Sequence, residues 1–225
     1  MTAVRDQLVN FIWGGHDPYL GFPQSVYAKD LQGWGSQHRY LRECIEELRP
    51  RLIVEIGVWK GGSSVFMGSK LKELGLNAAL ISVDTWLGSV EHWLNPEWRE
   101  MLGFEFGRPS IMNTFLKNVL DENLQDVIVP LPLDSLNAVQ VLSALAVIPD
   151  IIHLDAGHDY KSVLSDIEIW WPILRPGGYF IGDDYGPEST WVGVKQAFDE
   201  YFGARGLGGF EFEAPKCRIK KPLAR

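Results

Sequence analysis

Short apolar runs that alternate with helical segments are the feature that most limits what this chain can fold into. Each run is followed within a few residues by glycine or an acidic residue, and then by a segment with helical spacing of its apolar positions. Strands that alternate with helices predict a mostly parallel sheet that is covered on both faces. The runs lie at residues 52–56, 78–83, 126–131, 151–154 and 179–181.

Two more strands are expected at residues 209–213 and 216–220, which gives a doubly wound α/β fold with a mostly parallel seven-stranded sheet. The length of 225 residues suits a single domain of this kind, spanning residues 1–225. Residues 1–50 are predicted to form an N-terminal lid and helix region. Residues 85–113 form an aromatic-rich insertion that is too long for an ordinary connection between a strand and a helix.

Composition excludes several classes of partner. The net charge of −8 argues against binding to a nucleic-acid backbone. The basic tail, Lys216 to Arg225, is expected to be a solvated end. Cys44 and Cys217 are too few for a disulfide framework and lack metal-site spacing, which favours a reduced, cytoplasmic compartment. Residues 1–11 lack a signal-peptide pattern, and no apolar run approaches the roughly 20 residues that span a bilayer. We expect no membrane partner.

The segment after the first run, residues 55–63, is rich in glycine. Gly57 and Gly61 allow tight turning and close approach to a ligand, and the following helix offers free N–H groups. The spacing is GxxxGG, which is neither the dinucleotide GxGxxG nor a P-loop. Asp84, at the end of the second run, is placed to accept hydrogen bonds from ribose hydroxyls. The alternative is that the glycines only turn the chain and Asp84 caps a loop.

The run EIGVWKGGSS followed by SVDTW resembles the cofactor motif and ribose-binding acid of class I S-adenosylmethionine-dependent methyltransferases. The resemblance implies a Rossmann-like fold that binds S-adenosylmethionine. Ser63 or Ser64 would support the methionine end of the cofactor, and Asp134 and Ser135 would touch the adenine amine. The implied cofactor contacts are Glu55, Gly57, Gly61, Ser63, Ser64, Asp84, Asp134, Ser135 and Asp155.

Three carboxylates follow the fourth and fifth predicted strands. Asp155 ends one of them, and Asp183 and Asp184 end the other. Neighbouring strands would bring the three groups together, where like charges raise at least one pKa unless a cation is bound. An all-oxygen set suits Mg²⁺ or Mn²⁺. The alternatives are that Asp155 only caps a helix and that one of the other two is structural.

His158 stands three residues after Asp155. Asp-x-x-His followed by Gly-Asp-Asp resembles metal-dependent O-methyltransferases that act on sugars of natural products, the rhamnosyl O-methyltransferase and cephalosporin hydroxylase-like group. The resemblance covers residues 50–200. It implies that Asp155, Asp183 and Asp184 hold a metal ion. His158 and Asp155 are the implied catalytic residues, with His158 accepting the proton of a substrate hydroxyl.

The sequence thus predicts a Mg²⁺-dependent O-methyltransferase for a hydroxylated small molecule such as a sugar or another natural product. Metal-independent transfer with His158 as base and a non-catalytic S-adenosylmethionine-binding module remain open. A nicotinamide-dependent oxidoreductase is a weaker alternative because GxGxxG is absent. The aromatic segments suit a ligand, a covered sheet edge or a homo-oligomer interface equally. His153, Trp170 and Trp171 are expected in the core.

Overall fold

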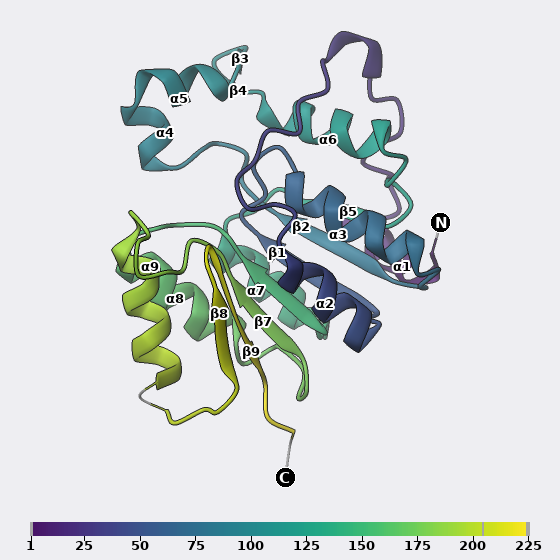
Figure 1. Cartoon of the computed structure of the whole chain (residues 1–225). Helices are drawn as coiled ribbons and strands as arrows, with labels where there is room; N and C mark the ends of the chain where they lie inside the picture. The colour runs from purple at the N-terminus through teal and green to yellow at the C-terminus, as the bar shows by residue number, and fades with distance from the viewer. Residues whose placement is uncertain (1, 204, 224–225) are drawn as a thin grey trace.

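A seven-stranded sheet with the order β5-β2-β1-β6-β7-β9-β8 forms the centre of the computed structural model, which describes residues 2–203 and 205–223 (Figure 1). The first five strands in this order are parallel, β9 is antiparallel to β7, and β8 is antiparallel to β9. This confirms the predicted doubly wound α/β fold. The strands are β1 (Leu52–Ile56), β2 (Ala79–Val83), β5 (Ile128–Leu131), β6 (Ile151–Leu154), β7 (Tyr179–Gly182), β8 (Phe210–Glu213) and β9 (Lys216–Lys220).

Helices cover both faces of the sheet, so the central strands are buried on both sides and are mostly apolar, with Glu55, Ser82 and His153 as the buried polar exceptions in β1, β2 and β6. One face packs against α2 (Arg39–Leu48), α3 (Gly62–Glu73) and α6 (Ile111–Asp121). The other face packs against α1 (Ala3–Trp13), α7 (Ser135–Ala144), α8 (Tyr160–Trp170) and α9 (Val192–Phe198). Two short helical turns also occur, a 3₁₀ turn at Gln24–Val26 and a π-helical turn at Asp199–Gly203.

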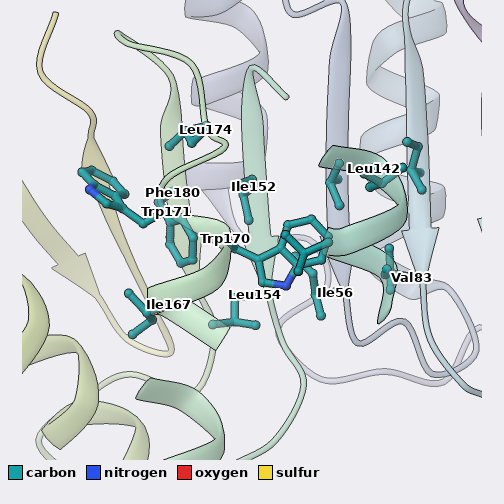
Figure 2. Packing of buried hydrophobic residues seen from close by; sticks show 14 of the residues in the cluster. Ile56, Val83, Leu142, Ile152, Leu154, Ile167, Trp170, Trp171, Leu174 and Phe180 are labelled. Carbon is teal, nitrogen blue, oxygen red and sulfur yellow. The ribbon is translucent and has the colours of Figure 1, made fainter. Parts of the chain in front are cut away.

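The core on the α7 and α8 side contains the two tryptophans predicted to be buried. Trp170 is fully buried and Trp171 is almost so, which confirms the prediction. Figure 2 shows these side chains with Ile56, Leu154 and Phe180 between the helices and the sheet. Burying one large apolar side chain contributes about 1.5–3 kcal/mol to stability, so this cluster anchors α8 firmly to the strands.

The insertion is more regular than the sequence suggested. It contains α4 (Val90–Leu94), α5 (Pro96–Met101) and a small hairpin of β3 (Phe104–Glu105) and β4 (Arg108–Pro109), which stand apart from the sheet at the upper left of Figure 1. The Asn95 side chain accepts hydrogen bonds from the first N–H groups of α5. Helices this short do not bury a continuous apolar face, so the sequence shows no helical periodicity from which they could be predicted.

Two terminal segments differ from expectation. Residues 1–35 showed no sustained period, but they contain α1, which packs on β2 and β5 and buries only Arg5, Leu8 and Val9. The basic tail was predicted to be a solvated end, and this prediction is wrong for its first part. Lys216–Lys220 is strand β9, paired with β7 and β8, and Lys216 is fully buried. No described helix is long and apolar enough to cross a membrane.

Candidate active site

A cavity of about 740 Å³ opens at the edge of the sheet where the parallel strands end. Parallel strands present their carboxyl ends at one edge, so the loops after β1, β2, β5, β6 and β7 meet there. The predicted site residues that line the cavity are Gly57, Ser63, Asp84, Asp134, Ser135, Asp155, His158, Asp183 and Asp184. Glu55, Gly61 and Ser64 lie outside the lining described for it.

The turn after β1 requires glycine because a side chain there would collide with other parts of the chain. Gly57 has φ of 82°, and a Cβ there would lie 1.7 Å from the carbonyl oxygen of Asp155. Gly61 has φ of 88°, and its Cβ would lie 2.7 Å from the Phe115 ring. A side chain at either position would collide with its neighbour. Gly57 therefore lets the turn after β1 pass directly beside the loop after β6, and Gly61 lets it pass beside α6.

Asp84 fixes the same turn from the neighbouring strand. Its Oδ2 accepts hydrogen bonds from the backbone N–H groups of Val58 at 2.8 Å and Trp59 at 3.0 Å, and its Oδ1 accepts one from Trp86 at 2.7 Å. Burial raises the pKa of Asp84, although these three donors act in the opposite direction. The carboxylate thus holds the β1 turn against the loop after β2 while it lines the cavity.

Glu55 supports the turn from behind the cavity wall. It is fully buried and accepts hydrogen bonds from the hydroxyls of both Ser63 and Ser64. The Nδ1 atom of His153 lies 3.1 Å from Glu55 Oε1. His153 is fully buried, which confirms it as a core histidine. Of these groups only Ser63 lines the cavity, so Glu55 and Ser64 act on the site through the start of α3.

Lys216 extends this buried network to Asp183, which lines the cavity. The sequence did not predict this role for Lys216. Its Nζ lies 3.2 Å from His153 Nε2 and forms an ion pair with Asp183. Burial works to raise the pKa of Asp183, but the charge of Lys216 and then that of His153 hold it below its usual value. The alternating pattern Lys-Cys-Arg-Ile-Lys indicates the strand, but it places Lys216 on the face opposite Cys217 and Ile219, so no local signal marks Lys216 as buried.

The three predicted metal ligands gather around Asp155. Its carboxylate lies within 4.8 Å of ligand atoms of His158 and Asp184, and likewise of His153 and Asp183. Burial, and then the negative charge of Asp183, raises the pKa of Asp155 well above its usual range. The carboxylates of Asp155, Asp183 and Asp184 thus outnumber the single buried ammonium group, that of Lys216. Carboxylate oxygens are hard donors, which suit Mg²⁺ or Mn²⁺. The donor set therefore fits a divalent cation.

The alternative role for Asp155 does not hold. The N-cap of α8 is Asp159, whose side chain accepts hydrogen bonds from the N–H groups of Lys161 and Ser162. Asp155 instead ends β6, four residues earlier, and projects into the cavity. It is thus available for chemistry at the site.

His158 is held at the rim of the carboxylate cluster. Its Nε2 lies 3.1 Å from Asp184 Oδ2, and its ring stacks on Trp191 with centroids 4.2 Å apart. Nδ1 is buried and has no hydrogen-bond partner among the described residues, so Nε2 is the nitrogen that faces the site. Asp184 adopts φ of 55°, a left-handed conformation that is uncommon outside glycine and is often found at functional sites.

Aromatic rings from three separate segments form the mouth of the cavity. Trp59 and His92 have centroids 4.4 Å apart, and Trp34 lies between Trp59 and Trp98 at 6.3 and 6.4 Å. Trp34 is 60% exposed. No lysine or arginine is among the described residues that line the cavity, whereas several aspartates are. The mouth therefore offers flat apolar surface and no cation for an anionic group.

The chain resembles known proteins both in sequence and in fold. Residues 54–185 match the family model described as a methyltransferase domain. The Streptomyces olivaceus enzyme 8-demethyl-8-(2,3-dimethoxy-alpha-L-rhamnosyl)-tetracenomycin-C 4'-O-methyltransferase is 28% identical over 189 residues, which are 74% of this chain. The match spans 65% of that relative's own length.

Two solved structures share the fold at lower sequence identity. The O-methyltransferase from Bacillus cereus in complex with S-adenosylhomocysteine has a TM-score of 0.56 and 18% identity, covering 98% of both chains. The O-methyltransferase TomG from Streptomyces achromogenes in complex with S-adenosylmethionine has a TM-score of 0.58 and 13% identity, covering 98% of this chain and 91% of that one. Given the family match and this strand order, the chain belongs to the methyltransferase-domain family and has the class I methyltransferase fold.

Proposed function

We propose that this protein transfers a methyl group from S-adenosylmethionine to a hydroxyl oxygen of an uncharged small molecule such as a sugar unit, with Mg²⁺ or Mn²⁺ bound. One observation carries the proposal. His158 Nε2 and the carboxylates of Asp155, Asp183 and Asp184 meet at the cavity end of β6 and β7, beside the glycine-rich turn after β1. Metal-assisted O-methylation requires a proton acceptor, a cation site and a turn that binds the cofactor, and this cavity has a candidate for each.

The residues have separate roles in this proposal. Asp155, Asp183 and Asp184 would hold the divalent ion, with Lys216 supporting Asp183 from behind. When bound, S-adenosylmethionine supplies an electrophilic methyl group, and the ion lowers the pKa of a hydroxyl beside it. His158 accepts the hydroxyl proton at Nε2, and the nearby Asp184 carboxylate stabilises the resulting imidazolium. Trp191, stacked on the ring, keeps the imidazole in place.

The acceptor class is supported by the lining and by a relative. The described lining residues include no lysine or arginine, so a phosphate or carboxylate would find no partner besides the proposed metal ion, which favours a neutral acceptor. The exposed face of Trp34 suits a flat or sugar-like ring. The Streptomyces olivaceus relative is named for a rhamnosyl compound, so a rhamnoside is the first acceptor to try.

The test combines binding with methyl transfer. S-adenosylhomocysteine is titrated calorimetrically into the protein with Mg²⁺ and then with chelator. Protein and S-[methyl-³H]adenosylmethionine are then incubated with methyl α-L-rhamnoside, catechol and a primary amine. We expect micromolar binding in both titrations and Mg²⁺-dependent labelling of the rhamnoside. Absence of S-adenosylhomocysteine binding would refute the methyltransferase function, whereas labelling that survives chelation would refute only the metal requirement.

Replacing Asp84 by asparagine is expected to weaken S-adenosylhomocysteine binding at least tenfold. The substitution removes a charged acceptor that holds the β1 turn and that we assign to the ribose hydroxyls, and hydrogen bonds to a charged group contribute about 1.5–3 kcal/mol. Asp126→Asn is the matched control, because Asp126 pairs with Lys72 outside the cavity. Calorimetry on both variants measures the effect. Equal affinities for the two variants would contradict a cofactor role for Asp84.

A further inference from the structure

His92 belongs to the aromatic insertion and stands in the wall of the cavity. It is the third residue of α4, lines the cavity and is half-buried. Its ring centroid lies 4.4 Å from that of Trp59 and 5.7 Å from that of Trp98. The Trp59 ring is itself held in place, because its Nε1 donates a hydrogen bond to Gln32 Oε1 at 2.8 Å. The imidazole is thus part of the aromatic mouth, where we place the acceptor.

One nitrogen of this ring is occupied at the start of α4. The backbone N–H of Ser89 donates a hydrogen bond to His92 Nδ1 at 3.2 Å, and the Ser89 hydroxyl lies 2.7 Å from the same atom. The two residues form a capping box, in which a histidine takes the place of the usual glutamate or glutamine. A backbone N–H can only donate, so Nδ1 is the unprotonated nitrogen and acts as the acceptor.

The other nitrogen, Nε2, therefore carries the proton of the neutral ring. Burial lowers the pKa of His92, the charge of Glu91 opposes this effect and the charge of His158 adds to it, so the neutral form prevails at pH 7. Nε2 has no hydrogen-bond partner among the described residues, and it is not among the buried unpaired atoms. His92 thus presents one unused N–H donor to the cavity that it lines.

The loop before α4 supports this donor from behind. Gly88 has φ of 78°, and a Cβ there would lie 3.3 Å from His92 Cβ and 2.7 Å from the Leu102 side chain. Leu102 is fully buried, so the loop packs closely against the base of the His92 side chain. Rotation of the imidazole would also break the hydrogen bond from the Ser89 N–H. A donor that is fixed before binding loses little conformational freedom when a ligand arrives.

We propose that His92 binds the methyl acceptor, with Nε2–H donating a hydrogen bond to a hydroxyl or ether oxygen of the sugar. This inference rests on the proposed function. The two histidines of the cavity then have opposite tasks, because the unprotonated Nε2 of His158 accepts the proton of the reacting hydroxyl, whereas the protonated Nε2 of His92 holds a different oxygen. A fixed donor also disfavours a protonated amine, which has no lone pair to accept the hydrogen bond.

Two substitutions at position 92 separate hydrogen bonding from packing. His92→Phe keeps an aromatic ring beside Trp59 and Trp98 but has no donor, whereas His92→Gln keeps an N–H donor without the ring. With methyl α-L-rhamnoside and radiolabelled S-adenosylmethionine, we expect His92→Phe to raise KM at least tenfold and to leave kcat within about threefold, because the contact is equal in the ground and transition states. His92→Gln should keep KM within about threefold. His16→Gln, at an exposed histidine outside the described cavity lining, is the control and should change neither constant.

Deoxy analogues and nitrogen-15 spectra test the hydrogen bond itself. Monodeoxy rhamnosides that keep the reacting hydroxyl are compared with the parent compound on the unmodified protein and on His92→Phe. One analogue should lose about tenfold in kcat/KM with the unmodified protein and less than about twofold with His92→Phe, where the donor is already absent. Equal losses in the two proteins for every analogue would overturn the contact. In histidine-labelled protein, with the His92 signals assigned by their absence from His92→Gln, a proton on Nδ1 in place of Nε2 would overturn it too.

The outcomes separate this inference from the proposed function. If the unmodified protein binds no S-adenosylhomocysteine, both are refuted. If it binds S-adenosylhomocysteine but does not methylate the rhamnoside, cofactor binding stands, and the sugar acceptor and the role of His92 are both overturned. If His92→Phe keeps the original KM, methylation of the rhamnoside stands and the ring serves only for packing. A fall of more than about threefold in the calorimetric affinity of His92→Phe for S-adenosylhomocysteine would place His92 against the cofactor and would likewise overturn the inference.

Discussion

Replacement of Lys216 by methionine is expected to lower the free energy of unfolding by about 3–5 kcal/mol. Methionine keeps most of the length of the side chain but leaves Asp183 buried without its cation, next to Asp155. Removing one partner of a buried ion pair has this order of effect because the remaining charge is uncompensated. Urea unfolding in the presence of chelator, followed by circular dichroism, measures the change.

Lys220→Met on the same strand is the control for this experiment. Lys220 pairs with Glu47 at 2.6 Å, but its side chain is 44% exposed. Exposed pairs contribute little, so the expected change is less than about 1 kcal/mol. Equal destabilisation by the two substitutions would contradict a special role for the buried lysine. Adding Mg²⁺ to the Lys216→Met protein should restore part of the loss if the ion binds beside Asp183.

Replacement of His158 by alanine is expected to lower kcat by about 10²- to 10⁴-fold with the proposed rhamnoside acceptor. The substitution removes the group beside Asp184 that we propose as the proton acceptor, and it leaves the β1 turn and Asp84 unchanged. Calorimetric affinity for S-adenosylhomocysteine should therefore stay within about twofold of the unmodified protein. Single-turnover methyl transfer separates this effect from product release.

His92→Asn is the comparison for His158→Ala. It removes another ring from the cavity wall, where His92 contacts the tilted rings of Trp59 and Trp98. His92 contacts the aromatic rings at the mouth of the cavity and is not part of the cluster formed by Asp155, Asp183 and Asp184. Its loss should therefore raise KM more than it lowers kcat. An equal fall of kcat in both variants would mean that general damage to the cavity, and not loss of a base, accounts for the effect of His158→Ala.

The strands were predictable because burial on both faces leaves short runs in which apolar residues predominate. Ile151–Leu154 is such a run, interrupted by the buried His153, and its observed bounds equal the expected ones. The rule that ligands bind where parallel strands end then pointed to Asp84, Asp155 and Asp183, which all line the cavity. Both inferences depend only on local pattern and on a general property of parallel sheets.

The residues that were missed depend on distant partners. Lys216 is buried by contacts with His153 and Asp183, which lie 63 and 33 residues earlier in the chain. Asp166, which also lines the cavity, sits inside a helix, and its hydrogen bond from Ser135 follows from the packing of α8 on α7. No local pattern encodes such contacts, because they exist only after the elements have assembled.

The buried chain from Ser82 through Ser64, Glu55 and His153 to Lys216 crosses the sheet from β2 to β9. Changing one member leaves its neighbours buried and unpaired, whereas exchanging several together for apolar residues of similar volume is close to neutral. Evolutionary drift at these positions should therefore be concerted. Among homologues of this fold, the residue at position 153 should covary with those at positions 55 and 216, although the three are far apart in sequence and on three different strands.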